Sequence, residues 1–366
     1  MHDTWSARAD SAEEAVFARH VRRLWGLPGT ALGVVAWPPV KRERTFLRWH
    51  YWWQAHLIDC EVDAAERAPT AKRRRRITRI ARAHRLRNLT GWTNSFYDDM
   101  AWLGLALERA QRLHLVDNRR AISALESQLF DAWDPMSGGG IPWSKKHPFF
   151  NVPANGPAAI MLARTGKLWR AQAIADWIDE TLIDPDTHLV FDGVNADGRV
   201  ETPIYSYCQG VVLGAETELA VHLGDPKHSH RVYRLVQAVE EHLTRDGVIV
   251  GGGGGDGGLF NGVLARYLAL VATSLPGHDD EDYRARSTAR DIVLASAESA
   301  WKNCLLIEGL PLFGRDWTQL AQLPGFGQSL GRYTAGSVTS SSVPERDFSV
   351  QLSGWMLMEA AHAVEA

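Results

Sequence analysis

Two neighbouring carboxylates, Asp98 and Asp99, are the residues of this sequence best suited to chemistry. An apolar segment with helical periodicity follows them, so we expect the pair at a helix start. Adjacent Cα atoms lie about 3.8 Å apart and diverge by roughly 100° on a helix, so the carboxyl carbons can stand about 5–6 Å apart. A retaining glycosidase needs a nucleophile and an acid/base about 5–5.5 Å apart, and the doublet predicts that chemistry.

The expected surroundings of the doublet would give its two members different charges. The positive end of a helix favours the ionised form of the nearer carboxyl group. Burial and like-charge repulsion raise the pKa of the other, which keeps its proton. An Asp-Asp doublet is also a common plain helix cap, so the doublet alone leaves a structural role open.

Three glycine-rich, aromatic segments stand before other apolar helices, at 137–155, 191–209 and 251–261. Glycine lets a backbone approach a ligand closely, and Trp and Tyr offer flat, half-apolar faces. The chain holds 15 Trp in 366 residues, and a sugar ring suits such surroundings. Trp49, Trp52 and Trp53 are predicted to lie in the core or on its rim, with substrate contact by one of them as the alternative.

The elements that must position these residues are mostly helical, because apolar residues recur at helical spacing and alternating runs are few. Short polar residues precede the apolar helices at positions 98, 155, 209, 261 and 353, which are 57, 54, 52 and 92 residues apart. Such residues suit helix starts. More amphipathic helices are expected between them, at 11–24, 72–87, 119–132, 168–182, 229–243 and 280–301.

A period of about 50 residues indicates stacked helical hairpins. With 44–65 as the first apolar helix, six hairpins predict an all-α, (α/α)6 toroid or barrel in one domain, 1–366. The last unit is longer because 305–346 is a Gly-, Pro- and Ser-rich insert, expected to hold a β-hairpin or a lid. An open helical solenoid is the alternative.

Charge and composition exclude several function classes. Lys plus Arg is 40 and Asp plus Glu is 43, a formal charge of −3, so no nucleic acid partner is expected for the whole molecule. No segment has the roughly 20 apolar residues of a membrane span. Residues 1–15 lack a secretory signal, which predicts a cytoplasmic protein as written, or an extracytoplasmic one if a leader was removed.

No metal or cofactor is predicted. The three cysteines (Cys60, Cys208 and Cys304) are far apart, and the histidines form no HExxH pattern. The glycines at 251–258 lack the Lys-Ser or Lys-Thr of a P-loop.

The segment Lys72 to Arg87 carries nine Lys and Arg residues. It is predicted to be a solvated outer helix, with the binding of an anionic partner as the second interpretation.

Several motifs together resemble glycoside hydrolase family 76, the endo-α-1,6-mannanases and related fungal wall transglycosidases. Tyr97-Asp98-Asp99 is similar to the family's catalytic segment, and GGGIPW at 138–143 resembles its GGGIWW loop. Further similar segments are NVPAN at 151–155, YSYCQGV at 205–211, and LFNGV at 259–263 with RYL at 266–268.

The resemblance implies a retaining α-1,6-mannanase with an (α/α)6 barrel, acting on α-mannan. Asp98 would be the nucleophile and Asp99 the acid/base. The expected substrate-binding residues are Tyr97, Trp143, Asn151, Asn155, Asp192, Tyr207, Gln209 and Phe260. Four departures from the family pattern (Met100, Pro142, Cys208 and Asn261) leave the exact substrate and transglycosylation open. A non-catalytic mannan-binding protein and another sugar chemistry on the same ring, such as epimerisation or uronide hydrolysis, are the alternatives.

Overall fold

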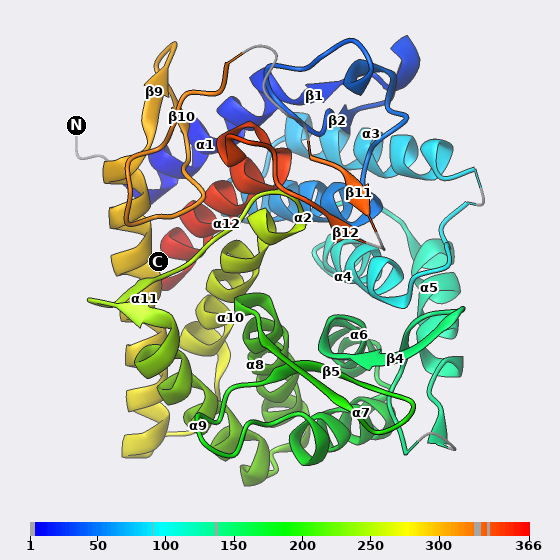
Figure 1. Cartoon of the computed structure of the whole chain (residues 1–366), viewed down its shortest axis with the longest axis vertical. Helices are drawn as coiled ribbons and strands as arrows, with labels where there is room; N and C mark the ends of the chain where they lie inside the picture. Colours follow the sequence, from blue (N-terminus) through cyan, green and yellow to red (C-terminus); the bar gives the residue numbers. More distant parts are fainter. Residues whose placement is uncertain (1–3, 90, 136–137, 326–330, 335–336) are drawn as a thin grey trace.

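Six helices form an inner ring in the computed structural model, which describes residues 4–89, 91–135, 138–325, 331–334 and 337–366. Neighbouring helices of the ring contact each other in chain order, and α12 returns to contact α2. The ring is therefore closed, and the open solenoid is excluded (Figure 1). The inner helices are α2 (Tyr51–Arg67), α4 (Tyr97–Arg112), α6 (Val152–Arg164), α8 (Ser206–Leu223), α10 (Phe260–Ser274) and α12 (Phe348–Glu365).

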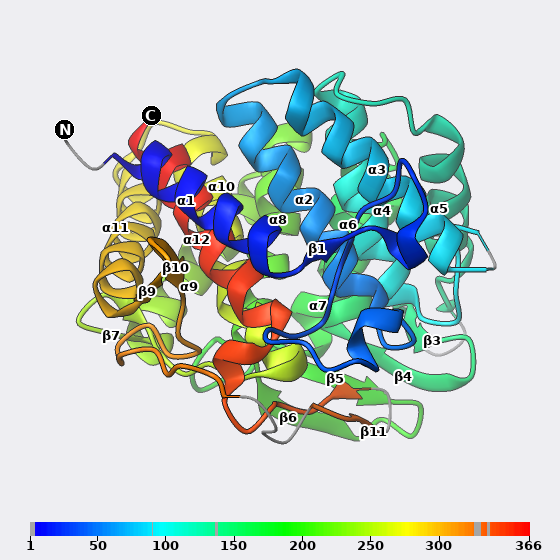
Figure 2. The same ribbon diagram turned by 90° about the horizontal axis from the view of Figure 1, so that it is seen from above.

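Six outer helices run antiparallel to the inner ones and cover the ring. Each contacts an inner helix that adjoins it in the chain, and α1 contacts both α2 and α12 at the closure of the ring. Figure 2 shows the two layers from the side. The outer helices are α1 (Trp5–Arg19), α3 (Ala71–Arg87), α5 (Arg119–Asp131), α7 (Leu168–Thr181), α9 (Pro226–Leu243) and α11 (Asp280–Asn303).

The inner helices begin earlier than the sequence pattern indicates. The polar-glycine doublets at 155–156, 209–210, 261–262 and 353–354 lie inside the helices, between their second and seventh residues, and are not caps. Glycine is needed there because successive inner helices touch: a Cβ on Gly210 would lie 2.9 Å from Leu264 Cα, and one on Gly262 would lie 2.7 Å from Ser353 Cα. The doublets mark close helix packing, which explains why they repeat with the fold.

A four-stranded antiparallel sheet stands where the sequence pattern predicts loops. Its order is β3 (Pro142–Ser144), β4 (His147–Asn151), β5 (Phe191–Asn195) and β6 (Val200–Ile204). The central pairing joins Phe150 to Val194 and Asn151 to Gly193. Because β4 and β5 are separated by a whole helical hairpin, no local periodicity reveals their pairing.

Short hairpins complete the described part of the chain. The insert 305–346 holds β9 (Leu305–Ile307) with β10 (Leu310–Leu312), β11 (Tyr333–Thr334) with β12 (Ser337–Val338), and the 3₁₀ helix η5 (Pro344–Arg346). The expected hairpin in the insert is thus confirmed. Elsewhere β1 (Val21–Arg22) pairs with β2 (Leu32–Gly33), and β7 (Thr244–Arg245) pairs with β8 (Val248–Ile249). Three further 3₁₀ helices are η1 (Leu24–Gly26), η2 (Glu43–Thr45) and η4 (Gly255–Leu259).

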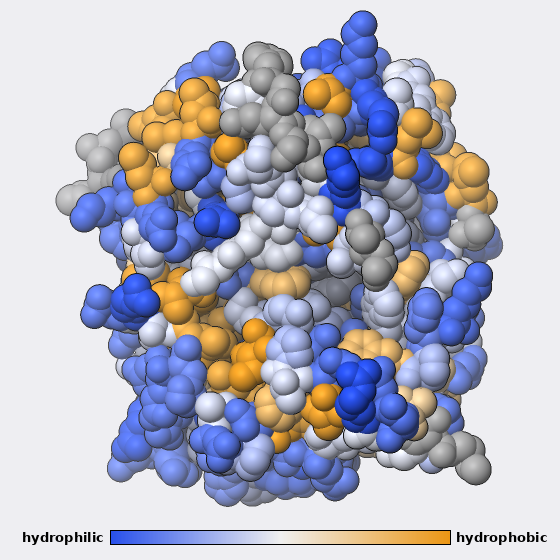
Figure 3. Space-filling view, in the orientation of Figure 1, coloured by the Kyte–Doolittle hydropathy of each residue, from blue (hydrophilic) through white to orange (hydrophobic). Residues whose placement is uncertain are grey.

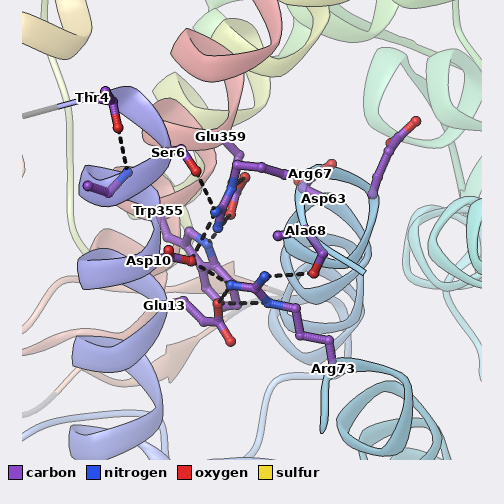
Figure 4. A network of polar contacts seen from close by, with 12 residues as sticks. Thr4, Ser6, Asp10, Glu13, Asp63, Arg67, Ala68, Arg73, Trp355 and Glu359 are labelled. Atoms are coloured by element: carbon purple, nitrogen blue, oxygen red, sulfur yellow. Dashed lines mark hydrogen bonds and ion pairs between the residues drawn. The ribbon is translucent and has the colours of Figure 1, made fainter. Parts of the chain in front are cut away.

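Buried ion pairs fasten the first helices to the last. Arg67 of α2 pairs with Glu359 of α12 at 2.8 Å and with Asp10 of α1 at 2.9 Å. Arg73 of α3 pairs with Asp10 at 2.6 Å and with Glu13 at 2.5 Å (Figure 4). The side chains of Arg67, Glu359, Arg73 and Glu13 are shielded from water, whereas that of Asp10 is 55% exposed. Removing one partner of a buried pair would leave the other charge without a counter-ion.

In the part of the chain that the structure describes, no helix has the length and apolar character needed to cross a bilayer.

Candidate active site

A cavity of about 300 Å³ opens at the end of the ring where the inner helices begin. The sheet β3–β6, the hairpin β11–β12 and the loop before α10 surround it, and Figure 3 shows a hollow near the centre of this face. Its lining is aromatic and acidic: His50, Tyr51, Trp52, Phe96, Asp98, Asp99, Trp102, Trp143, Phe149, Asn151, Asp192, Tyr205, Tyr207, Asp256, Phe260, Tyr333, Ser337 and Val338. Among these residues there is no Lys or Arg.

Asp98 and Asp99 lie in the first turn of α4 and line this cavity. The N-cap, Phe96, has no capping side chain, and the Oδ1 of Asp98 instead accepts the backbone N–H of Asp99 at 2.8 Å. The indole of Trp143 donates to the Oδ2 of Asp98 at 2.9 Å. The Oδ2 of Asp99 accepts from the amide of Asn94 at 2.6 Å. The first turn of α4 therefore both carries the two carboxyl groups and donates a backbone N–H to one of them.

The pKa of both carboxyl groups is raised. Burial raises the pKa of Asp98 to about 7, although the N–H groups of Asp99 and Trp143 oppose the shift. Burial and then the charge of Asp98 raise the pKa of Asp99 well above its usual range. Because Asp98 accepts the larger number of hydrogen bonds in this pair, we assign the negative charge to Asp98 and the proton to Asp99 at neutral pH.

A third carboxyl group, Asp256, faces the same cavity and was not among the predicted site residues. Its Oδ1 accepts from the indoles of Trp52 and Trp53 at 3.0 and 2.8 Å, and its Oδ2 accepts the backbone N–H of Val338 at 2.6 Å. Burial raises its pKa. A signal was present in the sequence: Asp256 is the one charged residue within the glycine-rich segment 251–261.

Stacked and tilted rings form one side of the cavity. Tyr207 and Phe260 stack with centroids 3.9 Å apart and planes 4° apart. Trp52 lies 6.5 Å from Tyr207 and 6.2 Å from Trp102, centroid to centroid. Flat apolar faces beside hydrogen-bonding carboxyl groups match the two surfaces of a sugar ring.

Five of the eight predicted substrate-binding residues line the cavity: Trp143, Asn151, Asp192, Tyr207 and Phe260. Asn151 also caps α6, since its Oδ1 accepts the backbone N–H of Ala154 at 3.2 Å. Burial and the charge of Glu201 raise the pKa of Asp192 to about 6. The structure thus gathers segments around 98, 143, 192, 207 and 260 at one opening.

Three predicted residues do not line the cavity. Tyr97 lies outside the lining, with its ring centroid 6.0 Å from the ammonium group of Lys145. Asn155 and Gln209 are fully buried. Asn155 exchanges two hydrogen bonds with the backbone of Ile141, and Gln209 does the same with Val190. The assignment of these two amides to substrate contact is therefore corrected to a role in holding loops.

The same pair of hydrogen bonds from one side-chain amide to one backbone residue, which we call the amide clamp, recurs in four inner helices. Gln54, Asn155, Gln209 and Gln351 each occupy the fourth residue of their helix, and each both donates to and accepts from one backbone residue of a neighbouring loop. A buried amide can satisfy both groups of a loop residue at once. Two of these bonded loop residues, Ile141 and Val190, lie two residues before the lining residues Trp143 and Asp192, so those two amides act on the site through the backbone.

Several lining residues are absent from the predicted set. Trp52 was predicted for the core or its rim and is now placed in the lining, with Trp102, Tyr205 and Tyr333. His50, at the start of α2, has a left-handed backbone with φ 47°, an unfavourable conformation for a side-chain-bearing residue. Burial and then Arg48 lower its pKa to about 4, which keeps its imidazole neutral near pH 7. No motif in the sequence marks it.

Among the described residues no three His, Cys, Asp or Glu side chains are grouped so that they could hold a metal ion. The expectation of chemistry without metal or cofactor stays a prediction.

Comparison with known proteins gives a family and a fold. The profile described as glycosyl hydrolase family 76 matches residues 8–351. No curated protein gives a significant match.

Several solved structures share the fold. The GH76A α-1,6-mannanase of Salegentibacter sp. HEL1_6 is 27% identical, with a TM-score of 0.81 over 98% of this chain and 99% of that one. An inactive variant of that enzyme, with two consecutive aspartates changed to asparagine, was solved with α-1,6-mannotriose, at the same identity and TM-score over 99% of this chain and 100% of that one. The Lin0763 protein of Listeria innocua is 24% identical, with a TM-score of 0.80 over 99% and 98% of the two chains.

Because the family profile covers nearly the whole chain, and because the helical ring matches that of an α-1,6-mannanase, the chain belongs to glycosyl hydrolase family 76.

Proposed function

We propose that this glycoside hydrolase cleaves α-1,6-linked mannan with retention of configuration, using Asp98 as nucleophile and Asp99 as general acid and base. The observation that carries the proposal is the pair itself: two adjacent carboxyl groups in one aromatic cavity, one held by two N–H donors and the other with a pKa raised by burial and by its neighbour. The substrate class is supported by the relative solved with α-1,6-mannotriose.

In the first step the Asp98 carboxylate attacks the anomeric carbon while Asp99 gives its proton to the glycosidic oxygen. The bond between that carbon and oxygen breaks, and a glycosyl ester on Asp98 forms. In the second step Asp99, now a carboxylate, takes a proton from the water that attacks the anomeric carbon. The ester bond breaks, and both carboxyl groups return to their first state.

The raised pKa of Asp99 supports the acid role, because a carboxyl group of ordinary pKa would carry no proton near neutral pH. The Trp143 and backbone donors support the nucleophile role, because they stabilise the charged form of Asp98. Asp256 and Asp192 lie in the same lining and could accept from sugar hydroxyl groups.

The test is a panel of α-1,6-, α-1,2- and α-1,3-linked mannosides, with products weighed by mass spectrometry and their first-formed anomer read by NMR. Cleavage of the α-1,6 linkage alone with an α-configured first product is expected. A β-configured first product would refute retention, and product chains longer than the substrate would show transglycosylation. Binding without turnover would indicate the mannan-binding alternative.

A further inference from the structure

Helix α3 has two faces with different uses of its arginines. On the inner face Ile77, Ile80 and His84 are buried, and Arg73 and Arg76 pair with Glu13 of α1. Figure 4 shows the Arg73 part of this network. The cations of the inner face are therefore neutralised in holding α3 to the ring.

The outer face carries six exposed cations, which we call the basic face: Lys72, Arg74, Arg75, Arg79, Arg82 and Arg85. No Asp or Glu forms an ion pair with any of them among the residues that the structure describes. The guanidinium group of Arg85 lies over the ring of Trp92, 5.6 Å from its centroid. A solvated face of an ordinary helix mixes both signs, and this one carries a single sign.

The charge is a property of the region and not of the helix alone. Segment 19–50 holds 7 Lys or Arg residues and one acid, and segment 68–97 holds 9 Lys or Arg residues and no acid. Their combined formal charge is 7 + 9 − 1 = +15. The whole chain is −3, so the remainder is −3 − 15 = −18. The two segments lie together: the N–H of Ala31 donates to the carbonyl of Arg79 at 3.2 Å, and Arg87 donates to the carbonyl of Leu47 at 3.0 Å.

Large apolar side chains are exposed beside these cations. Trp25 is 51% exposed, Leu47 69% and Leu89 86%, with Leu27 and Leu86 also exposed. Trp25 is held in place, since its indole donates to the carbonyl of Thr45 at 2.8 Å. Figure 3 shows strongly hydrophilic and strongly hydrophobic side chains next to each other over this upper right part of the surface.

We propose that the basic face of α3, with Trp25 and the leucines beside it, binds the surface of an anionic lipid bilayer. Cations attract anionic headgroups, and exposed Trp and Leu enter the headgroup boundary, a combination typical of interfacial binding. A nucleic acid would also attract the arginines, and Trp25 could stack on one base, but the four exposed leucines (Leu27, Leu47, Leu86 and Leu89) offer its bases no stacking partner. The observed mixture of charge and aliphatic surface therefore favours lipid.

Docking on this face would set the active-site cavity beside the membrane. Leu47 precedes His50 by three residues, and His50 lines the cavity. Leu86 and Leu89 lie at the end of α3 that adjoins Leu47, through the contact of Arg87 with its carbonyl. The apolar side chains are thus at the cavity end of the basic face.

The test is flotation of the full chain with vesicles of phosphatidylcholine alone and of phosphatidylcholine mixed with phosphatidylglycerol. We expect binding only to the mixed vesicles, and its loss in about 1 M NaCl, where charges are screened beyond about 3 Å. Changing Arg75, Arg79 and Arg82 together to Gln should lower the partition coefficient about a hundredfold, because each cation contributes about fivefold.

Matched variants separate charge position from total charge. Lysine at the same three positions keeps the charge and should keep binding. Arg119→Gln, Arg245→Gln and Arg284→Gln remove three exposed cations elsewhere and should change binding less than about threefold. The pair Leu47→Ser and Leu89→Ser should weaken binding about tenfold without changing net charge.

Three results would overturn the proposal. The first is equal binding, or no binding, to the two vesicle types, and the second is an equal loss of binding in the two triple glutamine variants. The third is that the protein binds an RNA probe but not vesicles, and binds the RNA equally well when Leu47 and Leu89 are changed to Ser. Because flotation needs no substrate, its outcome is independent of whether the chain cleaves mannan.

Discussion

At the end of the ring where the inner helices begin, Asp98 and Asp99 have no Lys or Arg in the cavity lining. At the end where these helices finish, Asp59 pairs with Arg109 at 2.5 Å and with Arg266 at 2.9 Å, and Asp63 pairs with both arginines at 2.6 Å. Helices α2, α4 and α10 contribute to both ends. The same ring thus carries unpaired acids at one mouth and paired acids at the other.

The difference sets opposite protonation states for buried aspartates. Burial raises the pKa of Asp59, but the charges of Arg109 and Arg266 outweigh it and lower the pKa to about 2. Without such partners, burial and then the charge of Asp98 raise the pKa of Asp99 well above its usual range. Helix ends alone would act the other way, since carboxylates are favoured at N-termini. A cationic partner, and not position in the ring, decides whether the acid keeps a proton.

The larger hollow is at the paired end. It measures about 530 Å³, against about 300 Å³ for the cavity at Asp98 and Asp99. Arg67, Arg109, Arg164 and Arg266 line the larger hollow, and each pairs with an Asp or Glu side chain. Size alone therefore does not locate the chemistry in this ring, whereas the state of its acids does.

The largest expected effect is on turnover. Asp98→Asn and Asp99→Asn should each lower kcat/KM on α-1,6-mannan by at least about 10⁴-fold, because each removes a group that acts on the reacting bond. Asp59→Asn is the matched change at the other end and should leave kcat within about threefold. Circular dichroism checks that all three are folded. A nearly active Asp98→Asn or Asp99→Asn enzyme would end the assignment.

Stability should change in opposite directions at the two ends. Asp59→Asn strands part of the charge of two buried arginines and should lower the free energy of unfolding by about 3 kcal/mol. Asp99→Asn should raise it by on the order of 1–3 kcal/mol near pH 7, because ionisable Asp99 costs stability there. Denaturant titration measures both.

The pH dependence of these changes follows from the pKa shifts. The pKa of Asp99 is higher in the folded than in the unfolded chain, so the free energy of unfolding falls as pH rises above about 4. The stability gained by Asp99→Asn should therefore be present near pH 7 and disappear near pH 4. Asp59 has a folded pKa of about 2, so its stabilisation is complete above about pH 5 and is lost only as pH falls. Parallel pH profiles for the two variants would contradict the comparison.

The acid limb of kcat/KM should lie well above pH 4, near the pKa of about 7 for Asp98, because protonation removes the nucleophile. Trp143→Phe removes a donor to the charged form and should move this limb up by about one pH unit. Phe149→Leu alters the same lining without touching a donor, and should scale the rate without moving the limb. An unmoved limb in Trp143→Phe would refute the role of the indole.

The smallest expected effect is at Asp192, a lining carboxyl group with a pKa of about 6. Asp192→Asn should raise KM about threefold to tenfold through one weakened hydrogen bond to a sugar, with kcat little changed. Glu201→Gln removes the neighbouring charge and should leave KM unchanged. A fall in kcat instead would give Asp192 a part in the chemical step.

Much of the ring could be predicted from residue spacing. The period of about 50 residues and the alternation of apolar with amphipathic helices indicated six hairpins, and Asp98-Asp99 at the start of α4 indicated the chemistry. These features are local, since helix periodicity and adjacent residues need no distant partner. The polar-glycine doublets were also visible, but their interpretation as helix caps was wrong. In the sequence alone, a polar residue followed by glycine has the same pattern whether it caps a helix or packs closely against the next helix.

Tertiary structure alone decided what the doublet meets. Asp256, 157 residues after Asp99, and the loop strands 142–151 and 191–204 reach the cavity only when the ring closes. Asp59 has a pKa of about 2 because Arg109 and Arg266 lie beside it, and Asp98 has a pKa of about 7 because no arginine lines its cavity. The sequence determined which groups can ionise and that helical hairpins repeat along the chain; the fold determined the partners of the ionisable groups, because electrostatic and hydrogen-bond energies depend on distances in space and not along the chain.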